Sequence, residues 1–85
     1  MPEISRFYGI VITMFINEHS PPHFHIRYDN YRAIIEIENG KITGQLPPRA
    51  MRLVLEWLNL HKAELFENWE LLRNGKQSKR IKPLE

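Results

Sequence analysis

The sequence predicts an α+β domain, an antiparallel β-meander of about four strands with one long C-terminal α-helix packed on one face. Between residues 23 and 46, apolar and polar residues alternate as they do in half-buried strands. The pairs Asp29-Asn30 and Asn39-Gly40 lie between the alternating segments, where hairpin turns are expected. Residues 49–74 instead carry apolar residues at helical spacing. The 85 residues are enough for one small domain, which we place at residues 1–75.

The predicted meander begins with the segment 7–16, which is rich in β-branched and aromatic residues and is apolar on both faces. Gly9 interrupts this segment and indicates a bulge. The following strands are expected at residues 23–28, 31–38 and 41–46.

Two-residue turns at both pairs would fix how these strands face one another. His23 would then face Glu36, and Arg27 would face Arg32. His25 would face Ile34, and Glu36 would also face Thr43. One face of the meander is therefore expected to carry the side chains of His23, His25, Arg27, Arg32, Glu36 and Thr43.

The predicted helix has apolar residues on more than one side. Its main stripe should cover the sheet face that carries Phe24, Ile26, Ile35 and Ile37. This stripe consists of Met51, Val54, Leu55, Leu58, Leu65, Trp69 and Leu72. A second set lies on the other side of the helix and consists of Leu53, Trp57, Leu60 and Leu71.

One sheet cannot bury both sides of a helix, so we expect the second set to form a partner interface. The partner would be a second copy of the chain or a cognate small protein. The alternative is that the helix breaks near His61-Lys62 and its second half folds back.

The net charge of +2 is unevenly distributed along the chain. Residues 73–85 carry five basic side chains and one acidic side chain. We expect residues 76–85 to form a basic, flexible tail. Its candidate nucleic-acid contacts are Lys76, Lys79, Arg80 and Lys82.

The absence of cysteine excludes disulfides, thiolate metal sites and a cysteine nucleophile. No signal peptide is evident, and the apolar run 10–16 is too short to span a bilayer. We therefore expect a cytoplasmic protein with no membrane contact.

Three of the four histidines lie in the segment Asn17–His25, which contains the pair Pro21-Pro22. The prolines fix two φ angles and remove two backbone donors, so they predict a stiff bend before the strand. His23 and His25 are two residues apart, which places both imidazoles on one face of an extended strand. Polar residues on a solvated strand face are also ordinary, so this spacing alone does not establish a site.

The sequence resembles domain of unknown function 4160, a family of small prokaryotic proteins. The resemblance rests on segments 4–12, 17–25, 55–57, 60–61, 67–70 and 74–76. Members of that family are often encoded beside a protein of the uncharacterised family 2442. The resemblance therefore implies one component of a toxin–antitoxin-like module and brings no established catalytic residues.

The polar face predicts a chemistry that needs no cofactor. A histidine beside a carboxylate is suited to proton transfer near neutral pH. Two facing arginines repel each other unless an anion such as phosphate lies between them. We therefore expect the effector side of the module, with a metal-free ribonuclease site at His23, His25, Arg27, Arg32 and Glu36.

Two alternatives remain at this point. His19, His23 and His25, with Glu18 as a further candidate, are suitable ligands for zinc with an open coordination position. The protein could instead be a non-catalytic protein- or nucleic-acid-binding module, the antitoxin or regulatory partner.

Overall fold

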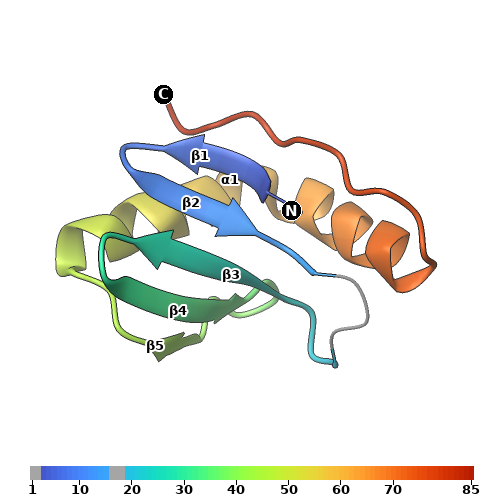
Figure 1. Cartoon of the computed structure of the whole chain (residues 1–85), viewed down its shortest axis with the longest axis horizontal. Coiled ribbons are helices and arrows are strands. Elements are labelled where there is room, and N and C mark those ends of the chain that lie inside the picture. Colours follow the sequence, from blue (N-terminus) through green and yellow to red (C-terminus); the bar gives the residue numbers. More distant parts are fainter. Residues whose placement is uncertain (1–2, 16–18) are drawn as a thin grey trace.

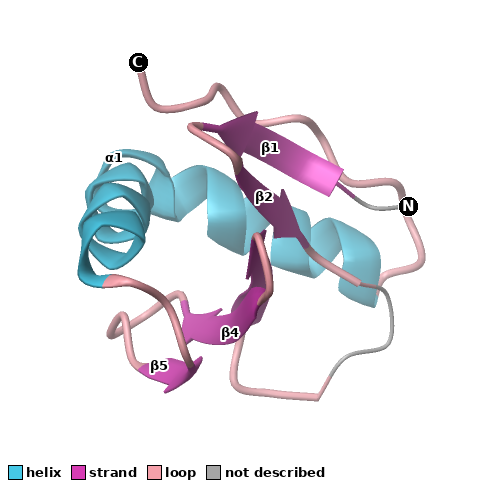
Figure 2. Cartoon of the chain, turned by 60° about the vertical axis from the view of Figure 1, so that its left-hand side comes forward, coloured by secondary structure: helices cyan, strands magenta, loops and turns pink. Residues whose placement is uncertain are grey.

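The computed structural model describes residues 3–15 and 19–85, which form one five-stranded antiparallel sheet and one long helix (Figure 1). The strands are β1 (Glu3–Phe7), β2 (Ile10–Thr13), β3 (His23–Tyr28), β4 (Tyr31–Glu36) and β5 (Ile42–Gly44). They lie side by side in chain order, and α1 (Pro48–Arg73) packs on one face of them (Figure 2). The predicted α+β class is confirmed, with five strands in place of about four.

The additional strand arises at Tyr8-Gly9. We expected one strand over residues 7–16 with a bulge at Gly9, and this is wrong because the chain reverses there into the hairpin β1–β2. Tyr8 and Gly9 have φ values of 51° and 80°, the left-handed region that a tight two-residue turn requires. A tyrosine rarely takes this conformation, so the pair carries little turn signal in the sequence. The end of the expected strand, Ile16, lies outside the described residues.

The predicted register of β3 and β4 is confirmed from His23↔Glu36 to Tyr28↔Tyr31. The next turn differs from the prediction. Residues 37–40 form a four-residue loop, in which the Gly40 amide donates to the Glu36 carbonyl and the Glu36 amide to the Lys41 carbonyl. Thr43 therefore faces Ile34 and not Glu36. The register of β5 against β4 thus differs from the predicted register by two residues, so Thr43 stays on the predicted face of the sheet.

The ends of α1 follow from its flanking residues. Pro48 needs no amide partner in the first turn, and Gly75 takes the left-handed conformation after the last turn, with φ of 75°. The amides of Gly75 and Lys76 donate to the carbonyls of Leu72 and Leu71, which closes the helix.

We expected an unbroken helix or one that folds back near His61; α1 is instead kinked there, and its two halves run in different directions (Figure 2). The His61 backbone leaves helical geometry at φ −125° and ψ 24°. Its Nδ1 lies 2.6 Å from the Glu64 carboxylate, and its ring packs on Trp57. The buried residues on both sides of the kink all belong to one stripe, namely Ala50, Val54, Trp57, Leu58, Leu65, Asn68, Trp69 and Leu72.

The expected second apolar face is therefore wrong for Trp57, which is 0 % exposed. At about 100° per residue, Trp57 lies only about 60° from Val54 around the helix, so it flanks the main stripe. The ring packs against Phe7 and Phe24, and its Nε1 donates to the Lys82 carbonyl at 2.9 Å. Of the four residues that we expected to form the face, Leu53 and Leu71 are half-buried and only Leu60 is exposed.

The Lys82 carbonyl belongs to the segment that we expected to be a flexible tail, which is also wrong. Residues 76–85 return along the outer edge of β1 (Figure 1), and the side chains of Ile81 and Leu84 are buried in the core. The Ile81 amide donates to the Ile4 carbonyl at 2.8 Å. The segment thus covers both the β1 edge and Trp57, which explains why the helix needs no partner chain at that position. Across the described residues, α1 lacks the run of apolar residues that a bilayer-spanning helix requires.

Candidate functional site

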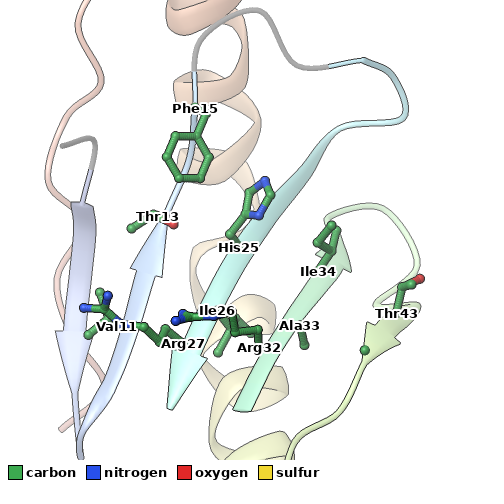
Figure 3. A pocket seen from close by; sticks show the side chains of 11 residues that line it. Val11, Thr13, Phe15, His25, Ile26, Arg27, Arg32, Ala33, Ile34 and Thr43 are labelled. Carbon is green, nitrogen blue, oxygen red and sulfur yellow. The ribbon is translucent and has the colours of Figure 1, made fainter. Parts of the chain in front are cut away.

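The sheet face opposite α1 contains a shallow cavity of about 480 Å³ (Figure 3). Its apolar lining comes from Val11 on β2, Ile34 on β4 and Phe15, which follows β2. Its polar and charged lining consists of Thr13, His25, Arg27, Arg32 and Thr43. We call this cavity the open-face pocket. Three of the five residues that we expected to be catalytic, His25, Arg27 and Arg32, line it.

Strand pairing arranges the pocket side chains in transverse rows. Thr13 faces His25, His25 faces Ile34, and Ile34 faces Thr43. The neighbouring row runs from Arg6 through Val11 and Arg27 to Arg32. Residues directly opposite on paired strands have Cβ atoms about 5 Å apart, so the two rows place His25 and the arginines on one continuous surface.

The arginines of this row differ in whether a carboxylate pairs with them. Arg6 is paired with Glu3 at 2.8 Å. Arg27 and Arg32 are exposed, and no carboxylate among residues 3–15 and 19–85 forms an ion pair with either of them. Both side chains lie across the open face of the sheet (Figure 3). Two facing guanidinium groups repel each other and destabilise a sheet. Such a pair is therefore typical of a surface that binds an anion.

Four rings form a continuous series beside the arginines. Phe15 contacts His25 edge-on at 4.7 Å between ring centroids, and His25 lies 5.4 Å from His23. His23 in turn lies 5.2 Å from Trp69 of α1. Both imidazoles are half-buried, but only His25 lines the open-face pocket, whereas the His23 ring packs against Trp69 of α1.

Among the described residues, His23 and Glu36 do not form the pair that we expected. His23 faces Glu36 in the register, yet its Nδ1 donates to the Pro21 carbonyl at 2.8 Å. A carbonyl only accepts, so this bond requires the tautomer that carries a proton on Nδ1. The Glu36 carboxylate accepts from Asn39 Nδ2 at 3.3 Å, within the loop that replaced the expected two-residue turn.

A protein-family model described as "Domain of unknown function (DUF4160)" matches residues 9–70. The chain belongs to the DUF4160 family. The match spans β2 to most of α1 and includes the whole lining of the open-face pocket. Segments 4–8 and 74–76, which also carry the resemblance seen in the sequence, lie outside the matched range. No curated protein and no solved structure matches the chain.

The alternative metal site of this DUF4160 member does not form from the expected histidines. No three metal-ligating side chains come together within the part of the chain that the structure describes, so His19 does not converge with His23 and His25. His19 is exposed beyond the cis Ser20–Pro21 bond, at a bend that directs the chain into β3. Glu18, a further candidate ligand, lies outside the described residues.

The candidate nucleic-acid contacts of the C-terminal segment are exposed but mostly paired. Lys79 lies 3.2 Å from the Glu67 carboxylate, and Lys82 lies 3.8 Å from that of Glu85. Arg80 pairs with Glu3 at 3.0 Å. The hydrogen bonds that Arg6 and Arg80 donate to Glu3 hold the pKa of its carboxyl group below the usual value. Lys76 is exposed just beyond the end of α1.

Sequence reasoning missed the apolar part of the pocket of this DUF4160 protein. Val11, Thr13 and Phe15 were assigned to one strand over residues 7–16, and the register of this strand with β3 was not predicted. The sequence did indicate that Ile34 could belong to a binding site, because it is an isoleucine on a predicted polar face, directly opposite His25. An apolar residue among charged neighbours on an uncovered sheet face is typical of a binding surface.

Proposed function

We propose that this protein is the effector component of a toxin–antitoxin-like module and that the open face of its sheet binds and cleaves RNA. One observation carries the proposal. Two imidazoles, His23 and His25, lie 5.4 Å apart, and His25 lines the pocket together with the arginine pair. Proton-transfer groups beside a phosphate-binding pair are the requirements of ribonuclease chemistry that proceeds without a metal ion.

In that chemistry the RNA supplies its own nucleophile. One imidazole accepts the 2′-hydroxyl proton while the 2′-oxygen attacks phosphorus, and the bond from phosphorus to the 5′-oxygen breaks. The second imidazole, protonated at the start, donates its proton to the departing 5′-oxygen. The products are a 2′,3′-cyclic phosphate and a 5′-hydroxyl. Arg27 and Arg32 stabilise the charge that develops on the phosphate oxygens.

We assign the base role to His25, because its position among the pocket residues brings it closest to a bound nucleotide. His23 then acts as the acid through Nε2, since Nδ1 donates to Pro21. The expected role of Glu36 becomes indirect, because its carboxylate accepts from Asn39 and acts on His23 only through charge.

A second candidate, a non-catalytic RNA-binding module, is favoured by the packing of His23. Its ring lies against Trp69 and its Nδ1 bonds the neighbouring backbone, as in a structural histidine that anchors the turn before β3. Such a module would bind RNA at the same arginine pair and leave it intact.

Expression in a bacterial host separates these functions. We expect the wild type to arrest growth, co-expression of the neighbouring gene to restore it, and His25→Ala to be harmless at equal protein level. His19→Ala is the matched control, because it removes an exposed histidine outside the pocket, and it should arrest growth as the wild type does. Harmless expression of the wild type, or equal toxicity of His25→Ala, would contradict the effector role.

A further inference from the structure

We infer that the open-face pocket receives one unpaired base of single-stranded RNA while Arg27 and Arg32 hold an adjacent phosphate. The inference rests on the proposed function and specifies its substrate class. It predicts that RNA in which the bases are paired is a poor ligand.

The size and lining of the pocket fit a base. Its volume of about 480 Å³ falls within the range of about 300–1,000 Å³ that is typical of small-ligand sites. Val11 and Ile34 form apolar walls, and the Phe15 ring stands at one end, edge-on to His25 (Figure 3). An apolar wall with an aromatic ring favours the flat face of a base over a phosphate.

Hydrogen-bonding groups flank these walls. Thr13 and Thr43 lie at opposite ends of one transverse row, with His25 and Ile34 between them. Their hydroxyls both donate and accept, so they suit the polar edges of a base without requiring one particular base. We therefore expect a preference for single strands and only a modest preference for sequence.

The arginine pair supplies the binding site for the phosphate. Arg27 and Arg32 lie in the row next to His25, and neither forms an ion pair with a described carboxylate. A phosphate between them would relieve their mutual repulsion and would lie beside the imidazoles. Because His25 and Arg27 are two residues apart on β3, a base in the pocket and a phosphate at the arginines are separated by about 7 Å, which is the scale of a single nucleotide.

The shape of the pocket is also the reason why we expect duplex RNA to be a poor ligand. The pocket is recessed into a sheet face, and the bases of an A-form helix are stacked inside it. Only a nucleotide whose base is turned outwards can place that base against Val11 and Ile34. Duplex RNA could reach the arginines with its phosphates alone.

A second copy of the chain is a less suitable occupant of the same face. In a two-fold dimer the same patch meets itself, so four guanidinium groups from Arg27 and Arg32 would be brought together. Charge of one sign across an interface opposes association. The face is therefore complementary to a polyanion and not to itself.

Fluorescence anisotropy with 2′-O-methyl RNA measures binding without cleavage, because the methyl group blocks the nucleophile. The probes are a labelled single strand of eight nucleotides and a blunt duplex of the same sequence. We expect the wild type to bind the single strand at least about tenfold more tightly, and Phe15→Ala and Ile34→Ala to lower that preference. Arg27→Ala with Arg32→Ala should weaken binding to both probes and reduce the salt dependence.

Arg49→Ala with Arg52→Ala is the matched control, since it removes the same charge from exposed helix positions outside the pocket. It should leave the preference unchanged. Equal affinity for both probes, or equal effects of the control and pocket variants, would overturn the inference. A pocket variant that dissociates a dimer in sedimentation, with RNA affinity unchanged, would overturn it in favour of a second copy.

The test is separate from that of the proposed function. Cleavage of RNA without a single-strand preference would leave the ribonuclease proposal standing and remove this inference. Single-strand binding without cleavage would do the reverse and favour the non-catalytic binding module.

Discussion

The Asn68 side chain binds both backbone groups of Lys79. Its Nδ2 donates to the Lys79 carbonyl and its Oδ1 accepts from the Lys79 amide, each at 2.8 Å. Asn68 is 1 % exposed, so these bonds are made in the interior. These two hydrogen bonds resemble those between paired strands. They hold the C-terminal segment against α1, in which Asn68 lies eleven residues before Lys79.

Asn68→Ala should therefore lower the free energy of unfolding by about 1–3 kcal/mol, because it leaves the Lys79 backbone groups without their partners. Asn59→Ala is the control, since Asn59 is exposed on the same helix. Urea denaturation of both variants measures the difference. Equal stability of the two variants would mean that the segment contributes nothing to the fold.

The core and the surface of α1 should respond differently to the same substitution. Leu58 is buried, whereas Leu60 is 65 % exposed. Leu58→Ala should cost about 2–5 kcal/mol because it leaves a cavity, and Leu60→Ala should change the unfolding free energy by less than about 0.5 kcal/mol. Thermal and urea unfolding measure both values.

A Leu60→Ser variant tests the expected partner interface. An interface centred on Leu60 predicts that Leu60→Ser dissociates a complex without unfolding the chain. The burial of Trp57 by the chain's own segment predicts instead that Leu60→Ser leaves the mass in sedimentation unchanged.

The Glu3 carboxylate links stability to pH. Its pKa is lowered in the folded state, first by the hydrogen bond from Arg6 and then by that from Arg80. Its contribution to stability is therefore present above the ordinary glutamate pKa and is lost as the pH falls through the lowered folded-state value. Glu3→Gln should destabilise the protein at neutral pH, and its difference from the wild type should shrink in acid.

Urea midpoints at pH values on both sides of the ordinary glutamate pKa measure this effect. Glu56→Gln is the control, because it removes an equal charge from an exposed position of α1. A Glu3→Gln deficit that stays constant or grows in acid would contradict the assigned role of the carboxylate.

The parts of the fold that the sequence predicted correctly depend on local patterns. Alternation and the Asp29-Asn30 turn placed His23 opposite Glu36 and Arg27 opposite Arg32, as observed. Helical spacing placed Val54, Leu58 and Leu65 in the core.

The errors concern features that local patterns do not determine. Tyr8 takes the left-handed conformation although tyrosine rarely does so, and the first hairpin was therefore missed. The burial of Trp57 depends on Ile81 and Lys82, which return from far along the chain. The open-face pocket was missed because no register was predicted between the first strand and β3, and this pairing places Val11 opposite Arg27.

Cleavage of a single-stranded RNA tests the central claim most directly. The purified protein is incubated with an end-labelled RNA in EDTA, and the same RNA carrying 2′-deoxyribose throughout serves as the control substrate. We expect cleavage of the RNA alone, with 2′,3′-cyclic phosphate ends, and a loss of about 100-fold or more in rate for His25→Ala. His19→Ala should cleave at the wild-type rate. An intact RNA after prolonged incubation, or cleavage by His25→Ala at the wild-type rate, would contradict the claim that the open face is a ribonuclease site.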